Sequence, residues 1–330
     1  MFCHSLEPYK NEYMVTKTQS PRALFIAGPT ASGKSAIALA IAEAVGGCII
    51  NADSMQVYDQ LQVLTARPSA ADMARVPHHL YGHIDPSAAF SVGQWQSAAL
   101  AAIAQAHAKQ QVPIVIGGTG LYFKALSDGL ADVPETPAPI RAGLRQRLKQ
   151  QGAKALYAEL QQCDAALAAR LQPQDGQRII RGLEVFEATG QPLSHWQQQP
   201  TRSPLEFPVA EILLMPERSW LYERCDRRFV TMIEHGALDE VAALAARKLS
   251  PDLPAMKALG VAELMAYQAG DMTLEQATTQ AQQQTRRYAK RQMTWFRNQM
   301  ISWNSFSEQD YEHKMDKIFS FISKIGLTSG

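Results

Sequence analysis

The chain has 330 residues, with Lys+Arg 32 against Asp+Glu 31 and a formal net charge of +1. Because the charges balance over the whole chain, any argument for a polyanionic partner must come from local clusters. The four cysteines, Cys3, Cys48, Cys163 and Cys225, form no C-x-x-C pair and predict neither a disulfide framework nor a cysteine zinc site.

Residues 1–21 are polar and lack the apolar core of a signal peptide, so we expect a disordered extension with no secretion signal. No uncharged apolar run reaches the length of a membrane span. These features predict a cytoplasmic protein without membrane contact. Nothing in the sequence demands more than a monomer.

Short apolar runs alternating with helical patterns predict a parallel α/β sheet flanked by helices. The expected strands are 22–28, 47–54, 80–86, 112–120 and 209–215, and the expected helices between them are 35–45 and 91–111. The adjacent pair His78 and His79 precedes the third run. No acid or cysteine stands at ligand spacing there, so we expect a structural role and no metal.

Two proline-rich stretches bracket a change of pattern, because only helical periodicity lies between them. We therefore expect an α/β core over 22–132 and 208–304, interrupted by an all-helical insertion domain over 133–207. From Trp220 the chain is mostly helical, with a long helix lacking a recognisable cap from Thr273 to about Met300. Residues 305–330 predict a surface helix and tail with no evident chemistry.

The segment GPTASGKS fits the phosphate-loop pattern G-x-x-x-x-G-K-[ST], and it lies between an expected strand and an expected helix. The fold is therefore expected to be like that of the P-loop NTPases. Backbone N–H groups of such a loop converge on phosphate oxygens, while Lys34 adds a charge and the Ser35 hydroxyl can hold Mg²⁺. The predicted phosphate-binding residues are Gly28, Pro29, Thr30, Ala31, Ser32, Gly33, Lys34 and Ser35. The motif alone does not distinguish ATP, GTP or a simple diphosphate.

Asp53 is the acid at the end of the second expected strand, in NADSMQVY. The carboxyl end of a neighbouring parallel strand would face the same crevice as the phosphate loop. Asp53 is then either a metal ligand or general base near the phosphates, or a cap of the following turn.

Five sequence blocks together resemble the bacterial tRNA dimethylallyltransferases (the IPP transferase family): GPTASGKS, NADSMQVY, GGTGLYFKAL, QRIIRGLEVFEATG and RRYAKRQMTWFR. The resemblance implies a P-loop α/β core with a helical insertion. It also implies transfer of a dimethylallyl group from dimethylallyl diphosphate to N6 of adenosine 37, 3′ of the tRNA anticodon. The products would be N6-(dimethylallyl)adenosine and diphosphate, with Mg²⁺ as cofactor, and the phosphate loop would hold a leaving group.

The resemblance also implies roles for individual residues. Asp53 would act as the general base, Thr119 would position the adenine or the reacting centre, and Arg224 would clamp the diphosphate. Arg228 lies on the same helical face as Arg224, and for either arginine a surface ion pair with Glu223 or Asp226 is the alternative. The implied tRNA-contacting positions in the core and the insertion are Asp53, Ser54, Met55, Gln56, Thr119, Arg141, Gln177, Arg178, Ile179, Ile180 and Arg181.

The segment QTRRYAKRQMTWFRNQ gives an independent indication of RNA, because it carries cations and no acid. At about 100° per residue its cations fall within an arc of about 140°, opposite Tyr288, Gln292, Trp295 and Phe296. We expect the aromatic side to be buried and the cationic side to meet a polyanion. The cations are Arg286, Arg287, Lys290, Arg291 and Arg297.

One segment departs from the family. Where the family has Gly-Tyr and a basic residue, this chain has Gly260, Val261 and Ala262, with Lys257 as a partial substitute. Two other functions stay open on the residues alone. A P-loop small-molecule or nucleoside kinase would turn over ATP, and a non-catalytic P-loop RNA-binding protein would not need Asp53.

Overall fold

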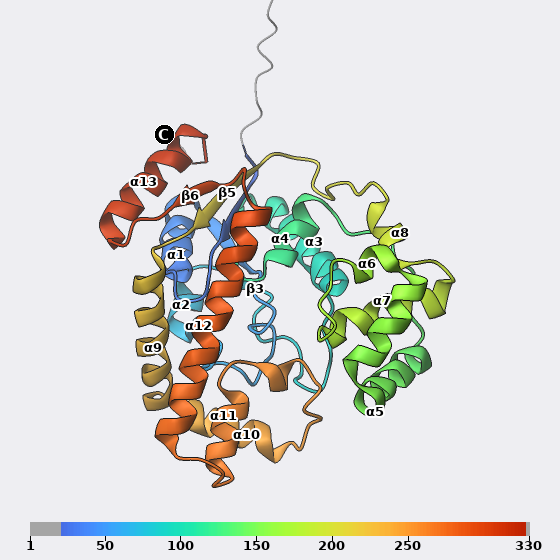
Figure 1. Ribbon diagram of the computed structural model, residues 1–330. Coiled ribbons are helices and arrows are strands. Elements are labelled where there is room, and N and C mark those ends of the chain that lie inside the picture. The colour runs from blue at the N-terminus through green and yellow to red at the C-terminus, as the bar shows by residue number, and fades with distance from the viewer. Residues whose placement is uncertain (1–20, 328–330) are drawn as a thin grey trace, which may run out of the picture. The chain divides into compact units, whose positions relative to one another are not determined.

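The computed structural model describes residues 21–327, so the expected disordered extension over 1–21 lies almost wholly outside the described residues. The described part divides into two compact units (Figure 1). The first comprises the chain up to Phe123 and from Glu206 onward, and the second comprises Lys124–Leu205.

The first unit is built on a six-stranded sheet in which every pair of neighbouring strands is parallel, with the order β3-β2-β4-β1-β5-β6. This confirms the predicted fold class. The strands are β1 (Ala23–Ala27), β2 (Gly47–Asn51), β3 (His78–His79), β4 (Val112–Gly117), β5 (Val209–Leu214) and β6 (Asn304–Phe306).

Two strands differ from expectation. The expected third strand over 80–86 is wrong, because the pairing with β2 occurs at His78 and His79 and the chain then turns at Leu80, where φ is +65°. The edge strand β6 was not predicted. It pairs with β5 over only three residues, too short a run for alternation to reveal.

Helices cover both faces of the sheet. One hydrophobic cluster joins residues of β1, β2, β4 and β5 to α1 (Lys34–Val45) and α13 (Tyr311–Lys324). Phe25 of β1 lies outside this cluster. Its ring contacts Phe123 of α4 (Gly120–Ser127) and Trp303, with ring centroids 5.7 and 6.2 Å away, respectively. The remaining helices of this part are α2 (Ala70–Arg75) and α3 (Val92–Ala108).

The C-terminal helix of the described range has more than a surface role, because Ile318 and Ile322 of α13 are fully buried in the sheet cluster. Its outer side is exposed, as expected for an amphipathic helix.

A second hydrophobic cluster of the first unit joins residues 57–64 to a group of helices and the short 3₁₀ helix η1 (Ala255–Lys257). The helices are α9 (Arg218–Glu234), α10 (Ala237–Ala246), α11 (Val261–Gln268) and α12 (Leu274–Gln299). The helices α9 and α12 lie side by side (Figure 1). The expected long helix is present, but it is capped: the Thr273 hydroxyl accepts from Gln276 N–H and the Gln276 side chain accepts from Thr273 N–H.

The second unit is all helical around its own hydrophobic cluster. Its helices after α4 are α5 (Ala138–Cys163), α6 (Ala165–Ala168), α7 (Gly176–Thr189) and α8 (Leu193–Gln198). The helix α5 is broken at Gly152 by a positive φ of +78°.

Candidate functional site

The phosphate loop lies between the carboxyl end of β1 and the start of α1, where β4 and β5 flank β1 on opposite sides. Ligands of open parallel sheets bind at such a position. Gly33 has φ +92° and caps α1, a conformation that favours glycine. A side chain at Gly28 would meet the Leu214 carbonyl oxygen at 2.8 Å, so the loop can pass β5 only with glycine there.

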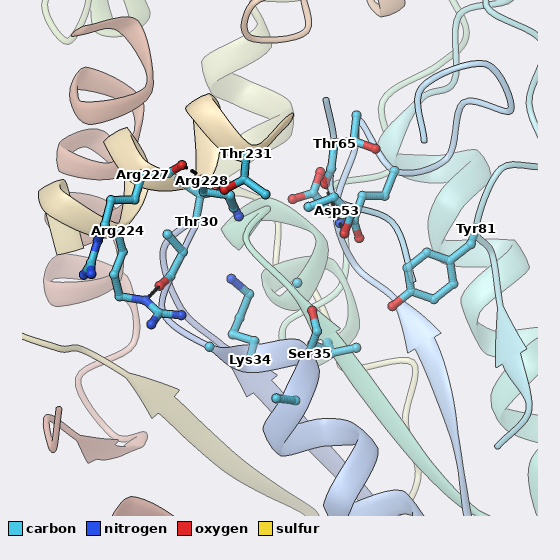
Figure 2. A pocket seen from close by; sticks show the side chains of 17 residues that line it. Thr30, Lys34, Ser35, Asp53, Thr65, Tyr81, Arg224, Arg227, Arg228 and Thr231 are labelled. Atoms are coloured by element: carbon cyan, nitrogen blue, oxygen red, sulfur yellow. Dashed lines mark hydrogen bonds between the residues drawn. The ribbon is translucent and has the colours of Figure 1, made fainter. Parts of the chain in front are cut away.

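A cavity of about 540 Å³ opens in front of this loop (Figure 2). Thr30, Ala31, Gly33, Lys34 and Ser35 of the predicted loop line it. Gly28, Pro29 and Ser32 support the loop and do not line the cavity. Ser32 is fully buried, and its hydroxyl has no hydrogen-bond partner among residues 21–327.

Three cations converge on the loop. Lys34 Nζ donates to the Pro29 carbonyl oxygen at 2.8 Å, and Arg224 Nε donates to the Ala31 carbonyl oxygen at 2.9 Å. Arg228 donates to the Thr30 hydroxyl from the next turn of α9. Burial lowers the pKa of Lys34 to about 8, with Asp53 opposing the shift and Arg228 adding to it, and burial also lowers the pKa of Arg228.

The ion-pair alternative for the α9 arginines is not what the structure shows. Arg224 stacks on Trp220, with its guanidinium 4.6 Å from the ring centroid. Asp226 pairs instead with Arg286 of α12 at 2.6 Å. No acid forms an ion pair with Lys34, Arg224 or Arg228 within the described range, so no salt bridge neutralises these three cations.

Asp53 lines the same cavity from the turn after β2. Its Oδ1 accepts from Met55 N–H at 2.9 Å, and its own N–H donates to Asn51 Oδ1 at 2.8 Å. The turn-capping interpretation is therefore correct for one carboxylate oxygen, while the same side chain reaches the cavity. Asp53 thus caps the turn and lines the cavity, and its role as a metal ligand or general base stays a prediction.

Thr119 is not among the residues that line the cavity. Its hydroxyl accepts from Ser54 N–H at 3.0 Å and donates to Ser54 Oγ at 3.3 Å, so it holds the turn that carries Asp53. Gln56 from the same turn lines the cavity and donates to the carbonyl oxygens of Thr65 and Ala66. Met55 packs instead against the second hydrophobic cluster of the first unit, which includes residues of α9, α10, α11 and α12.

The remaining predicted RNA contacts have different surroundings. In the second unit, Gln177 is exposed, Arg178 pairs with Asp175 at 3.4 Å, and Arg181 donates to the Thr136 hydroxyl at 3.0 Å and contacts Glu184 at 3.5 Å. Arg141 donates to the Thr136 carbonyl oxygen.

Ile179 and Ile180 are buried in the core of the second unit, so their inclusion among RNA-contacting side chains is corrected: the helical period that exposes Gln177 and Arg178 turns these residues inward.

The α12 segment has the two sides that its sequence predicts. Arg287, Lys290, Arg291 and Arg297 are exposed, while Gln292 and Phe296 are buried. The absence of acids in this segment does not extend to its surroundings, because Asp226 of α9 neutralises Arg286. Lys257 is exposed on η1, whereas Val261 is fully buried in the helix cluster and offers no surface contact.

Gln292 and Tyr81 are among the residues at the site that were not predicted from the sequence. Gln292 accepts from Thr30 N–H at 2.9 Å and donates to the Gly118 carbonyl oxygen at 2.8 Å, joining the phosphate loop to the end of β4. The available signal in the sequence was that Gln292 is a polar residue on the side of the helix expected to be buried. Tyr81 also lines the cavity, and Figure 2 shows its hydroxyl pointing inward from the side opposite the arginines. No sequence pattern marked it.

Among residues 21–327, no group of three or more His, Cys, Asp or Glu side chains is arranged to hold a metal ion. His78 agrees with the expected structural role, since its Nδ1 lies 2.9 Å from the Val76 carbonyl oxygen. No helix in the described range is long and apolar enough to span a bilayer.

A family model described as IPP transferase matches residues 56–299, and one described as isopentenyl transferase matches residues 21–81. The tRNA dimethylallyltransferase of Parvibaculum lavamentivorans is 53% identical over 307 residues, covering 93% of this chain and 98% of that protein. That of Azorhizobium caulinodans is 55% identical over 284 residues, covering 86% and 91%.

Solved structures agree with these relatives. The tRNA isopentenylpyrophosphate transferase of Bacillus halodurans matches with a TM-score of 0.66 and 35% identity, over 92% of this chain and 96% of that one. A eukaryotic dimethylallyltransferase described as acting on tRNA matches with a TM-score of 0.78 and 26% identity, over 92% and 80%. On these matches the chain belongs to the IPP transferase family.

Proposed function

We propose that this protein is a tRNA dimethylallyltransferase, which transfers the dimethylallyl group of dimethylallyl diphosphate to N6 of adenosine 37, next to the anticodon. The family membership and the names of its relatives support this function over a small-molecule kinase or a non-catalytic RNA-binding protein. We propose that the reaction takes place in the cytoplasm, with tRNA as the substrate. We also propose that the chain works as a monomer.

The observation that carries the proposal is the composition of one cavity. Its phosphate loop and its cations, free of ion pairs within the described range, favour a strongly anionic group, while Asp53 faces the same space as a carboxylate. A diphosphate that leaves with negative charge and an amine that must lose a proton need these two kinds of group together.

In the proposed reaction, the lone pair of adenine N6 forms a bond to C1 of the donor while the bond from C1 to the diphosphate oxygen breaks. The leaving diphosphate takes that electron pair and is stabilised by loop N–H groups, Lys34, Arg224 and Arg228. The excess proton on N6 passes to the Asp53 carboxylate. Thr119 acts by holding the Asp53 turn through Ser54.

The residues of the cavity fit Mg²⁺, which we propose as the cofactor. Mg²⁺ keeps several waters and usually takes few protein oxygens beside substrate phosphates. The Ser35 hydroxyl, which lines the cavity, is the candidate protein oxygen. When bound, the ion would neutralise diphosphate charge.

For the tRNA we propose two kinds of surface. The exposed cations Arg287, Lys290 and Arg291 of α12 suit backbone phosphates. Lys257, Gln177 and the arginines of the second unit are further candidates on their own surfaces. The turn residues 53–56 would meet the adenosine after it leaves its stack, which costs a few kcal/mol.

One reaction mixture tests the function: purified full-length protein, Mg²⁺, labelled dimethylallyl diphosphate and unmodified tRNA. We expect label to enter the tRNA at one adenosine, identified by nuclease digestion and mass spectrometry. Consumption of ATP with a small acceptor would favour the kinase. Binding of tRNA without any transfer would favour the non-catalytic protein.

A further inference from the structure

A second cavity, of about 330 Å³, adjoins the first. Five residues line both: Ser35, Ala36, Ala66, Tyr81 and Ile116. Apart from Ser35, this shared wall presents two methyl groups, the sec-butyl chain of Ile116 and the aromatic ring of Tyr81. The apolar end of the phosphate cavity is therefore the end that faces the second cavity.

The far side of the second cavity is also apolar over much of its surface. Leu39, Ala40, Ile49 and Pro68 line it and do not line the first cavity. Charged groups, including Arg67 and Arg75, also line it, and Arg75 is engaged with Glu43 at 2.7 Å. A hydrocarbon chain would find apolar contacts there. A second phosphate group is less suited, because Arg75 already pairs with Glu43.

Tyr81 is the largest side chain of the shared wall, and its ring is held in place. The ring packs against the hydrophobic cluster of the sheet and α1, and lies edge-on to His78 with centroids 5.6 Å apart. Its hydroxyl points into the phosphate cavity (Figure 2). A ring fixed by its neighbours can exclude a substrate atom, because the surrounding core resists displacement.

We propose that Tyr81 determines prenyl chain length by closing the phosphate cavity behind a five-carbon chain, and that the second cavity would accept the next isoprene unit if the ring were removed. This inference rests on the proposed function. With the diphosphate on the loop and C1 near Asp53, the shared apolar wall offers the donor's hydrocarbon end an apolar surface against which to bury.

The second cavity has room for a further isoprene unit. A cavity of about 150 Å³ accommodates a six-carbon ring, so the 330 Å³ of the second cavity exceed the need of one five-carbon unit. The restriction on longer donors then comes from access through the wall. A ten-carbon donor would place its second unit where the Tyr81 ring lies.

The test compares dimethylallyl and geranyl diphosphate as donors to unmodified tRNA, using wild-type protein and the variants Tyr81→Ala, Tyr81→Leu and Tyr81→Phe. We expect wild type to transfer the five-carbon group and to use geranyl diphosphate about 100-fold less well. Tyr81→Ala and Tyr81→Leu should raise the geranyl-to-dimethylallyl ratio of kcat/KM about tenfold or more, within the range that pocket size contributes per methylene. Tyr81→Phe should leave the ratio unchanged, since the ring remains.

A second substitution locates the added unit. Ala40 lines the second cavity alone, so Ala40→Phe in the Tyr81→Ala background should remove the gain with geranyl diphosphate and spare dimethylallyl transfer. The inference is overturned if wild type already uses both donors equally, or if folded Tyr81→Ala and Tyr81→Leu leave the ratio unchanged. If wild type transfers neither group, the proposed function itself fails, which is a separate result.

Discussion

The arginines of the phosphate cavity and those of the second unit have the same side chain and opposite surroundings. Arg224 and Arg228 donate to a carbonyl and a hydroxyl of the phosphate loop, and no acid pairs with them within residues 21–327. Arg178 and Arg181 each contact an acid one helical turn away, Asp175 and Glu184. The first pair therefore has no acidic partner to compete with an anionic ligand, whereas each arginine of the second pair already contacts a carboxylate.

This difference teaches how to rank cations as binding residues. An exposed ion pair contributes little free energy and is screened by salt, so losing such a cation changes little. A desolvated cation held without a counterion stabilises an incoming anion much more. We therefore expect the largest effects inside the cavity and the smallest on the second unit.

Replacing Asp53 by Ala should lower kcat about 100-fold or more, because the carboxylate that takes the amine proton is lost. Affinity for tRNA should stay within a few-fold of wild type, measured by filter binding. The exposed neighbour Asp59, changed to Asn, is the matched control. Normal turnover by Asp53→Ala would contradict the assignment of the base.

Replacing Arg228 by Met should raise the KM for dimethylallyl diphosphate about 10-fold to 100-fold, since a charge-assisted hydrogen bond to the diphosphate contributes about 1.5–3 kcal/mol. Steady-state kinetics at saturating tRNA measure this. Arg218→Met, on the exposed start of α9, should change the KM less than twofold. Equal effects of both changes would remove the contrast between buried and exposed arginines.

The rate should depend on pH through Lys34, whose pKa burial lowers to about 8. Below that pH the amine is protonated and its positive charge attracts the diphosphate, and as the pH rises through 8 this charge is lost. We expect kcat/KM for the donor to fall by up to tenfold per pH unit above 8. Lys34→Arg stays charged and should lack this alkaline decline. A flat wild-type profile up to pH 9.5 would exclude a charged Lys34 from donor capture.

Replacing Gln292 by Leu should lower the free energy of unfolding by about 1–3 kcal/mol, because Thr30 N–H and Gly118 C=O lose their shared partner. Urea denaturation followed by circular dichroism measures it. Gln283→Leu, at an exposed position of the same helix, should change stability by about 0.5 kcal/mol or less. Similar values for both would show that the bridge is dispensable.

The smallest effects are expected on the RNA-facing surfaces. Arg287→Ala and Lys290→Ala should each weaken tRNA binding a few-fold and reduce the salt slope, d log K/d log[salt], by about one. Arg178→Ala should change the slope by less, because Asp175 already engages that guanidinium. Titrations at several salt concentrations compare them. A larger effect for Arg178 would reverse the ranking.

Much of the first unit could be predicted from local pattern. The phosphate loop, β1, β2, β4, β5 and the long helix α12 each follow from a contiguous run of apolar residues, glycines or helical period. The position of β3 could not, since it depends on which two residues lie beside β2, and that is a long-range pairing. Likewise the buried face of α13 is defined only by the sheet it covers.

The sequence by itself determined the loop chemistry, the Asp53 turn and the cationic side of α12, because each is written within a few consecutive residues or one helical period. Only the tertiary structure decided which arginines form ion pairs with acids and which do not. Asp226 lies two residues from Arg224 in the chain and yet pairs with Arg286 of α12, while Gln292 and Tyr81 reach the cavity from distant segments. Side chains far apart in sequence share a dielectric environment and hydrogen-bond partners only after the core brings them together, and no local pattern encodes that proximity.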